Sequence, residues 1–493
     1  MDSRSENLLE TIRSRGTQGQ FVDYRYLPAQ NAHTSPWPDW IPTPVVSTWR
    51  YSGVDEPWLH QVQALEAIHS GHDVVIATGT GSGKSLVAWT PILSDLVQAD
   101  DSNRISDIHR RPSCLYLSPT KALAADQLHS LNRLVDGLEH DVALALADGD
   151  TPREAKEWAR ANADIVLTNP DYLHYVMLPR HERWTRFLAS LRYVIVDEMH
   201  QWRGVSGSHI SLVLRRLLRI ARHLGADVQV IMMSATLADP QSVAQTMIGR
   251  ENIDAITDDT SGRGTHHIFM WEGREVPREE DVSIDAFLSA LRAAEAGEET
   301  VLEAPTQRLS AQTEASLLCA ELIRANARLL TFVRSRGGAE AVAAQTRDKL
   351  RDAPELASTV AAYRGGFLPE ERRTLESALR SGRLRALATT SALEMGIDIS
   401  GLDVTITAGW PGTRASFWQQ VGRSGRAGAD GISVLIAGDN PLDSFLVHHS
   451  DEIFSPVEAA VLDPQNPWVL RDHLCAAAAE LPLAEDEAVS VFG

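Results

Sequence analysis

Short runs of β-branched and other apolar residues recur along the first half of this chain, and segments with a helical pattern separate them. Residues 211–224 are one such helical segment. Apolar strands that alternate with helices are typical of a parallel sheet that is covered by helices on both faces. The strand candidates are residues 73–77, 114–118, 163–168, 193–197 and 228–234.

The same alternation returns in the second half. There the strand candidates are residues 266–271, 327–333, 358–363, 385–390, 403–409 and 431–437. Residues 275–313 are charged and rich in Ala and Glu, which indicates an insertion or a solvent-facing helix. We therefore predict an α/β fold built from two similar halves in tandem.

This pattern also sets the expected domain limits. We place the two α/β domains at residues 47–250 and 251–455. Residues 1–46 are rich in Pro and Trp without clear periodicity, so we expect an extended N-terminal arm. Residues 456–493 are expected to be a helical cap or the start of a truncated accessory domain.

Composition limits the possible partners. The 493 residues carry a net charge of −20, the wrong sign for a protein that coats nucleic acid without specificity. Cys114, Cys319 and Cys475 lie far apart without metal-ligand spacing, which argues against a zinc site and fits a reducing cytoplasm. The sequence shows no apolar leader and no stretch of membrane-span length. We expect a cytoplasmic monomer without a membrane partner.

A glycine-rich segment, TGTGSGKS at residues 78–85, follows the first strand candidate and precedes a helical pattern. In this context the backbone N–H groups of such a loop, which include those of Thr80, Gly81, Ser82 and Gly83, cradle phosphate oxygens. Lys84 would contact the β and γ phosphates, and the Ser85 hydroxyl would contact Mg²⁺. Thr78 stands where the strict pattern has glycine, so a glycine-rich turn with an incidental lysine is the alternative.

Two adjacent acids end another strand of the same sheet, in the segment VIVDEMHQWRG. Paired carboxylates at the end of a buried strand are costly unless a cation or a catalytic role holds them. Asp197 can reach the Mg²⁺ held by Ser85, and Glu198 can act as general base toward the attacking water. A salt-bridged strand end is the alternative.

The order of short motifs resembles the superfamily 2 helicases of the DEAD/DEAH type, from about Trp58 to Gly428. Their fold, two tandem RecA-like domains, and their cofactors, ATP and Mg²⁺, are what the resemblance implies. The motifs are residues 118–127 (SPTKALAADQ), 168–174 (TNPDYLH), 197–200 (DEMH), 234–236 (SAT), 332–336 (FVRSR), 389–399 (TTSALEMGIDI) and 419–428 (QQVGRSGRAG).

Within this family, residues 146–151, 197–209, 234–240 and 409–426 are similar to the MrfA/SftH type of bacterial DNA helicase. The resemblance implies an ATP-driven 3′-to-5′ translocase on single-stranded DNA. Such proteins usually carry a C-terminal module in which four cysteines bind metal. Only Cys475 lies in the last part of this chain, so we do not predict this metal site here.

The resemblance also implies roles at the nucleotide. Gln61 would read adenine, and Gly396, Asp398 and Gln419 would belong to the ATP site. We expect Arg426 to be the arginine finger and Arg423 its partner, because planar guanidinium groups suit phosphate oxygens. Spaced three apart, they would share one face if this segment is a helix. His200, Ser234 and Thr236 would couple the motifs.

Contacts to the nucleic-acid backbone would come from hydroxyls and a few charged groups. For each threonine a helix N-cap is the alternative. The candidates are Thr120, Lys121, Thr168, Asp171, Arg334, Ser335, Thr389 and Thr390. Trp410 and Trp418 could stack on a base, but we favour packing between helices.

We therefore expect a DNA-dependent ATPase that acts as a 3′-to-5′ single-strand DNA translocase or helicase in DNA repair or maintenance. Its partner would be single-stranded or 3′-tailed DNA, with an RNA:DNA hybrid as a further candidate. Two alternatives stay open, an RNA-dependent ATPase or RNA helicase and a nucleotide-gated DNA-binding scaffold that does not move.

Overall fold

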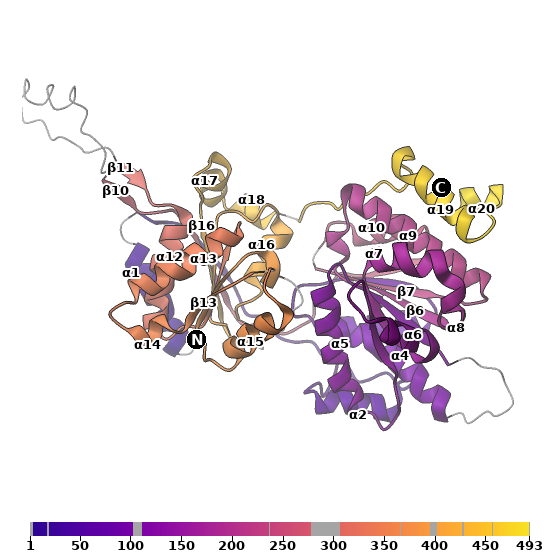
Figure 1. Cartoon of the computed structure of the whole chain (residues 1–493). Helices are drawn as coiled ribbons and strands as arrows, with labels where there is room; N and C mark the ends of the chain where they lie inside the picture. Colours follow the sequence, from indigo (N-terminus) through magenta and orange to yellow (C-terminus); the bar gives the residue numbers. More distant parts are fainter. Residues whose placement is uncertain are drawn as a thin grey trace, which may run out of the picture. The chain divides into compact units, whose positions relative to one another are not determined.

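Two compact units make up the chain in the computed structural model (Figure 1). The structure describes residues 3–16, 19–101, 111–235, 237–277, 306–364, 366–394, 402–425, 428–455 and 457–492. We call residues 31–262 with 456–493 the first unit, and residues 1–30 with 263–455 the second unit. Each unit contains one seven-stranded sheet, so the predicted α/β class with two parallel-sheet halves is confirmed.

The sheet of the first unit is entirely parallel, in the order β4-β5-β3-β6-β7-β2-β8. All five strands predicted in this half are present, with ends shifted by at most a few residues. The bounds are β2 Asp73–Ala77, β3 Ser113–Leu117, β4 Leu144–Ala147, β5 Ile165–Thr168, β6 Leu191–Val196, β7 Gln229–Ser234 and β8 Ile253–Ile256. The short strands β4 and β8 were not predicted.

Side chains alternate between the two faces of this sheet. Val74 and Ile76 of β2 pack into one core cluster, whereas Val75 between them packs into the other. Both faces are therefore buried, which explains why the strands read as continuous apolar runs.

Helices cover each face of the first sheet. On the face of Val74 lie α2 (Thr43–Tyr51), α3 (Leu59–His69), α4 (Lys84–Asp101) and α5 (Lys121–Val135). On the face of Val75 lie α6 (Arg153–Asn162), α7 (Pro170–Tyr172), α8 (Thr185–Ala189), α9 (Gly204–His223) and α10 (Pro240–Ile248). A π-helical turn, Leu173–Met177, joins α7 to a 3₁₀ segment, Leu178–Trp184.

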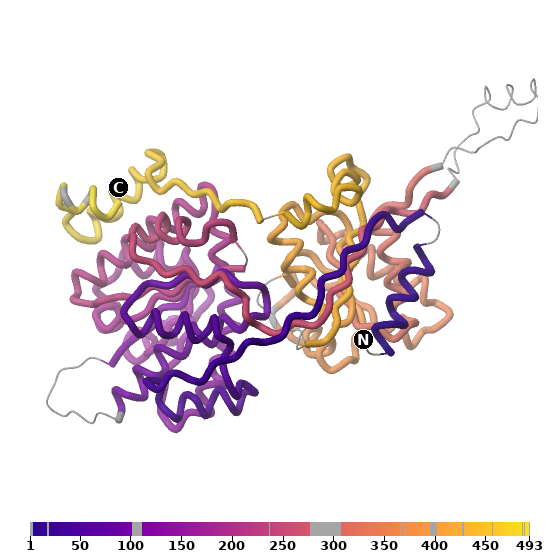
Figure 2. The backbone as a smooth tube through the Cα atoms, turned by 180° about the vertical axis from the view of Figure 1, so that it is seen from behind, coloured from indigo at the N-terminus to yellow at the C-terminus, as the bar shows by residue number. Residues whose placement is uncertain are grey.

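The sheet of the second unit has the order β1-β9-β16-β15-β12-β14-β13. Only β1 runs antiparallel, beside β9 at one edge (Figure 2). The bounds are β1 Phe21–Leu27, β9 His266–Trp271, β12 Leu329–Val333, β13 Val360–Tyr363, β14 Ala386–Thr389, β15 Val404–Ala408 and β16 Gly431–Ile436. The six strands predicted in this half are all present.

Helices also cover both faces of the second sheet. One face carries α1 (Ser3–Arg15), α12 (Ala311–Arg324) and α13 (Arg336–Lys349). The remaining helices of this unit are α14 (Pro354–Ala357), α15 (Pro369–Arg380), α16 (Arg414–Val421), α17 (Pro441–His448) and α18 (Asp451–Phe454). A small hairpin, β10 (Glu275–Pro277) with β11 (Thr306–Arg308), flanks the predicted insertion, most of which lies outside the described residues.

The N-terminal segment differs from the expected extended arm. Residues 3–15 form the helix α1, which buries Leu8, Leu9 and Ile12 against the second unit, and residues 21–27 form the edge strand β1. Only the stretch after residue 30 belongs to the first unit. The apolar spacing of α1 is the local signal for this arrangement.

The C-terminal tail folds onto α9 of the first unit. Helices α19 (Pro467–Glu480) and α20 (Glu485–Phe492) form a small core with α9 through Leu212, Val469, Ala477 and Phe492. These helices are compatible with both alternatives from the sequence, a helical cap and the start of an accessory domain. None of the helices described here combines the length and apolar character needed to cross a lipid bilayer.

Candidate nucleotide site

The phosphate loop connects β2 to α4 at the carboxyl edge of the first sheet. Gly81 and Gly83 have φ angles of 84° and 66°, a region that favours glycine. Helix α4 begins at Lys84, so its N-terminal N–H groups face the loop. The Lys84 ammonium lies 3.0 Å from the carbonyl oxygen of Thr78 and 2.8 Å from that of Gly79. The arrangement is suited to bind phosphate.

Gln61 packs directly against this loop. Its Oε1 accepts a hydrogen bond from the Trp58 N–H at 2.8 Å, and its Nε2 donates to the carbonyl oxygen of Gly83 at 3.0 Å. A Cβ at Gly83 would lie 2.4 Å from Nε2 of Gln61, so a larger residue would displace this side chain, and the φ of 66° also favours glycine. Inside the loop the hydroxyls of Thr78 and Ser82 are 2.6 Å apart.

The two acids follow β6 at the same edge of the sheet. Asp197 donates its N–H to the carbonyl oxygen of Leu117 at 2.9 Å, and one of its carboxylate oxygens accepts the Glu198 N–H at 2.8 Å. Burial, and then the charge of Glu198, raises the pKa of Asp197 to about 7. Glu198 has φ 49° and ψ 45°, a left-handed conformation that is uncommon outside glycine and turns it away from the strand direction.

The donor set fits a divalent cation. Two adjacent carboxylates, one of them buried, repel each other, and a cation would relieve that repulsion. Ser85 is the second residue of α4 and is half-buried. The Ser85 hydroxyl and the Asp197 carboxylate are the groups that would hold Mg²⁺, the usual partner of a nucleoside triphosphate.

His200 connects this site to the end of β7. Its Nδ1 lies 3.3 Å from the Ala235 N–H nitrogen, 3.4 Å from the Ser234 hydroxyl and 3.4 Å from a Glu198 carboxylate oxygen. Burial, with the charges of Lys84 and Arg203, lowers the pKa of His200 to about 4. The ring is therefore neutral at neutral pH, and its approach to Glu198 is not an ion pair. Thr236 lies outside the described residues.

Arg423 does not lie on a helix. Helix α16 ends at Val421, with Gly422 as its C-cap, so the expected shared helix face of Arg423 and Arg426 is corrected. The Arg423 guanidinium is buried and donates to the carbonyl oxygen of Glu394. Gln419 is buried within α16. Arg426, Gly396 and Asp398 lie outside the described residues.

Several of the nucleic-acid candidates have local structural roles. Thr120 caps α5 by accepting the Leu123 N–H at 3.2 Å, and Ser335 caps α13 by accepting the Gly338 N–H at 3.0 Å. Thr390 holds the N-cap position of a short 3₁₀ turn without a side-chain cap bond. The helix-cap alternative therefore applies to Thr120, and Ser335 has the same local role.

Two predicted contacts are not at the surface. Thr168 and Thr389 are both 0% exposed, and their hydroxyls donate to the carbonyl oxygens of Ala147 and Thr390. Both side chains are therefore buried in this structure, and a contact of either with nucleic acid stays a prediction.

The charged candidates are more accessible. Lys121 pairs with Asp150 at 2.8 Å and its side chain is 47% exposed. Arg334 pairs with Asp443 at 2.8 Å and its side chain is 54% exposed. Asp171 is exposed in α7.

The two candidate tryptophans, Trp410 and Trp418, pack against aromatic neighbours. Trp410 is buried beside Phe417 at 5.7 Å, and Trp418 lies 5.5 Å from Phe454, each distance joining ring centroids. Both belong to one apolar cluster of this unit. The packing interpretation, favoured from the sequence, describes these contacts.

Sequence reasoning missed two residues that contact the loop and a third that contacts one of them. His60 Nε2 donates to the Ser82 carbonyl oxygen at 3.0 Å, and Asp259 accepts the Gly79 N–H at 3.0 Å. Thr260 contacts His60 through its hydroxyl at 2.8 Å. His60 could have been noticed beside Gln61, but nothing in the local pattern distinguishes Asp259 from its neighbour Asp258.

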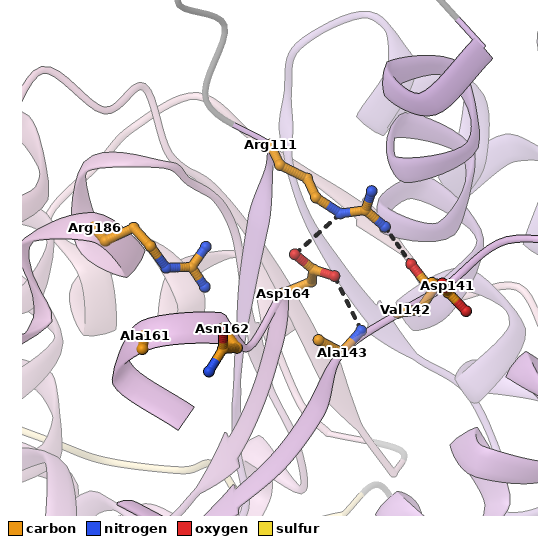
Figure 3. Close-up of a pocket in the computed structure, with 8 residues that line it drawn as sticks. All are labelled: Arg111, Asp141, Val142, Ala143, Ala161, Asn162, Asp164 and Arg186. Atoms are coloured by element: carbon orange, nitrogen blue, oxygen red, sulfur yellow. Dashed lines mark hydrogen bonds and ion pairs between the residues drawn. The ribbon is translucent and has the colours of Figure 1, made fainter. Parts of the chain in front are cut away.

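A cavity of about 470 Å³ lies elsewhere in the first unit (Figure 3). Its lining includes residues just before β3, β4 and β5, so it is at the amino edge of the sheet, opposite the phosphate loop. Arg111 lies 3.1 Å from Asp164, and Arg186 donates to the carbonyl oxygen of Ala163. Because the phosphate loop lies at the opposite edge of the sheet, this cavity is not the nucleotide site.

Comparison with known proteins agrees with this geometry. Residues 58–244 match the DEAD/DEAH box helicase family, and residues 314–428 match the helicase conserved C-terminal domain. The two units are accordingly RecA-like domains.

Among curated proteins, the chain is 33% identical to the uncharacterized ATP-dependent helicase YprA of Bacillus subtilis, over 98% of this chain and 60% of that protein. Among solved structures, MrfA, a DUF1998 helicase, bound to DNA and AMPPNP has a TM-score of 0.85 and 32% identity over 98% of this chain and 62% of that one. The helicase Lhr of Mycobacterium smegmatis bound to single-stranded DNA and AMP-PNP has a TM-score of 0.69 and 26% identity over 91% and 54%. The chain thus spans less than two thirds of these relatives.

Proposed function

Since the chain belongs to the superfamily 2 helicases of the DEAD/DEAH type, we propose that it is a DNA-dependent ATPase that moves 3′ to 5′ along single-stranded DNA. One observation carries the proposal. The phosphate loop and the DEMH acids meet at one sheet edge in a chain that is 32% identical, over 98% of its length, to a helicase solved with DNA and AMPPNP. We place its role in DNA repair or maintenance.

The first unit supplies the groups that act on ATP. Lys84 and the N-terminus of α4 bind the β and γ phosphates. Ser85 and Asp197 hold Mg²⁺, which when bound supplies positive charge to the phosphate oxygens. Glu198 accepts a proton from the attacking water, since its side chain is 20% exposed beside the buried Asp197. Gln61 is proposed to read the adenine.

The second unit supplies arginines to the nucleotide site and some of the contacts with DNA. We propose Arg426 as the arginine finger, with Arg423 as its partner and Gln419, Gly396 and Asp398 as further ATP-site residues. For the DNA backbone, the candidates that the structure leaves accessible or at helix starts are Thr120, Lys121, Asp171, Arg334, Ser335 and Thr390. The domain limits expected from the sequence were residues 47–250 and 251–455, and we propose to assign residues 251–262, which include β8, to the first domain.

ATP hydrolysis by the full chain, with polarity-defined DNA and RNA strands of equal length as activators, tests the proposal. We expect low basal hydrolysis that rises sharply with single-stranded DNA and much less with RNA. Streptavidin displacement from the 5′ end, but not from the 3′ end, would report 3′-to-5′ movement. Equal hydrolysis with and without nucleic acid would overturn the proposal. Stronger activation by RNA would indicate an RNA-dependent enzyme, and DNA binding without turnover would indicate a nucleotide-gated scaffold.

A further inference from the structure

Two of the places where the chain passes from one unit to the other, at residues 30/31 and 262/263, lie side by side (Figure 2). Gln30 and Arg263 exchange backbone hydrogen bonds of 2.9 and 3.0 Å, and the His33 N–H donates to the Thr260 carbonyl oxygen at 3.0 Å. Residues 30–33 and 260–263 thus form a short antiparallel pair, which we call the crossing ribbon.

The crossing ribbon is tied to the phosphate loop by the carboxylate of Asp259. Its Oδ2 accepts the Gly79 N–H at 3.0 Å. Its Oδ1 accepts the N–H of Ser261 at 3.0 Å and the hydroxyl of Ser261 at 2.6 Å. A Cβ at Gly79 would lie 2.8 Å from Oδ2, so the absence of a side chain there permits this contact. One carboxylate therefore joins a loop N–H to the first residues of the ribbon.

A second connection runs from Thr260 through His60 to Ser82. The carbonyl oxygen of Ser82 can only accept, so the hydrogen of the neutral His60 ring is on Nε2, 3.0 Å away. Nδ1 is then an acceptor, and the Thr260 hydroxyl and N–H lie 2.8 and 3.3 Å from it. His60 is 0% exposed, and burial lowers its pKa, which favours the neutral ring.

We infer that Asp259, together with the His60–Thr260 pair, transmits the nucleotide state of the phosphate loop to the crossing ribbon between the units. Asp259 is a positioning residue, because it acts on ATP only through the Gly79 backbone. The inference rests on the proposed ATPase function.

The physical basis is a difference in stability between two states of the loop. The phosphates of ATP are anionic, and like charges repel, so their arrival near the loop weakens the Asp259 contact with Gly79. A ligand shifts a conformational equilibrium only when it interacts differently with the two states. The Asp259 carboxylate interacts differently with the ATP-bound and ATP-free loop, and it directly precedes the ribbon residue Thr260.

Hydrogen–deuterium exchange of the full chain, without and with AMPPNP and magnesium, tests the inference. In the wild type we expect exchange to change both in residues 78–85 and in residues 257–263. In Asp259→Ala the loop still responds, and the response of the ribbon is lost. Asp258→Asn is the matched control, because Asp258 is the exposed neighbour, and it should respond as the wild type does. Asp259→Asn, which keeps one acceptor oxygen, should recover part of the ribbon response.

A binding measurement gives the size of the effect. The ratio of dissociation constants for single-stranded DNA, without and with AMPPNP, reports the coupling between the two sites. We expect this ratio to fall about 5- to 10-fold in Asp259→Ala and to be unchanged in Asp258→Asn.

The outcomes separate the two proposals. If AMPPNP changes exchange nowhere in the wild type, the proposed ATP site is wrong. If the loop responds but the ribbon does not, or the ribbon responds equally in Asp259→Ala, the present inference is overturned. If Asp259→Ala does not fold, Asp259→Asn decides in the same way, because its ribbon response must then fall below that of the wild type. A wild-type ribbon response in that variant also overturns the inference.

Discussion

The hydroxyl of Tyr116 donates a hydrogen bond to the carboxylate of Asp197, and both side chains are buried at the edge of the first sheet. Tyr116 comes from β3 and Asp197 follows the neighbouring strand β6. The phenol therefore stabilises the ionised form of an acid whose pKa burial and the Glu198 charge raise to about 7. This pairing tunes the acid that we propose as a magnesium ligand.

Replacement of Tyr116 by Phe should shift the pH dependence of ATP hydrolysis. Loss of this hydrogen bond raises the pKa of Asp197 further, so the acidic limb of kcat/KM moves to higher pH. A hydrogen bond to a charged group worth about 1.5 kcal/mol corresponds to roughly one pH unit. Tyr193→Phe is the control, because Tyr193 donates to Asp95 at 2.9 Å in the same unit, and its limb should stay in place. Coincident profiles for all three proteins would contradict this role of Tyr116.

Replacement of Asp197 by Asn should stabilise the magnesium-free protein at pH 8 while abolishing turnover. The folded pKa is about 7, whereas an unfolded Asp titrates near 4. Between these values the folded protein holds a proton that the unfolded chain has lost, so the free energy of unfolding falls as pH rises through this window. Asn does not ionise and avoids that loss.

The stability gain should be on the order of 1–3 kcal/mol at pH 8 and vanish near pH 4, as measured by thermal unfolding in EDTA. Added magnesium should raise the melting temperature of the wild type and not that of Asp197→Asn. If Asp197→Asn is less stable than the wild type at pH 8, burial of the ionised Asp197 carboxylate does not destabilise the folded protein.

Gly83→Ala should weaken ATP binding. The new methyl group would lie 2.4 Å from Nε2 of Gln61, at a residue whose φ is 66°. Either the Gln61 side chain or the loop must move to accept it, and the left-handed φ adds backbone strain. We expect the dissociation constant for a fluorescent ATP analogue to rise at least about 10-fold, a cost of about 1.4 kcal/mol. Gly53→Ala is the control for backbone strain alone, because Gly53 has φ 91° and nothing lies within 4 Å of its Cβ position. Its affinity for the ATP analogue should stay unchanged. Equal affinity in Gly83→Ala would contradict the close fit.

Glu198→Gln should remove hydrolysis and keep ATP binding. The amide retains the size of the side chain but cannot accept a proton, and loss of a general base typically costs about 10²- to 10⁴-fold in rate. Single-turnover hydrolysis and analogue binding on the same preparation make the comparison. Loss of binding in this variant would point to a role in holding phosphate or metal instead.

The sheets and the loop were predictable because each follows from local chemistry. The apolar run DVVIA gives β2 at its predicted bounds, and the glycines and Lys84 after it give the turn into α4. Asp197 was predictable for the same reason, since an acid that directly follows a buried strand has few structural explanations.

Features that depend on distant contacts were not predictable. The edge strand β1 pairs with β9, some 240 positions later along the chain, and its own pattern is mostly half-buried rather than alternating. The helix expected to carry Arg423 ends at Val421, where Gly422 is the C-cap. Gly425 follows with φ 71°, which is not a helical conformation. Asp259 contacts a loop 180 residues away, and no sequence pattern records such a pairing.

The tail of the chain offers a further test, because Glu480 of α19 forms a buried ion pair with Arg216 of α9. The two side chains are 3% and 1% exposed. Arg216 also lies 2.9 Å from Nδ1 of His174 and 3.2 Å from Nδ1 of His473. Removal of Glu480 leaves the guanidinium buried without its counter-charge, and the rings of His174 and His473 cannot supply one.

Glu480→Ala should therefore lower the free energy of unfolding by about 3–5 kcal/mol, measured by urea denaturation of the full chain. Asp472→Ala on the same helix is the matched control. Asp472 pairs with Arg471 at 3.1 Å, but the two side chains are 68% and 70% exposed, and exposed pairs contribute about 0–1 kcal/mol. If the two substitutions have equal effects, the buried ion pair contributes no more to stability than the exposed pair does. The tail would then be held to α9 by its apolar contacts alone.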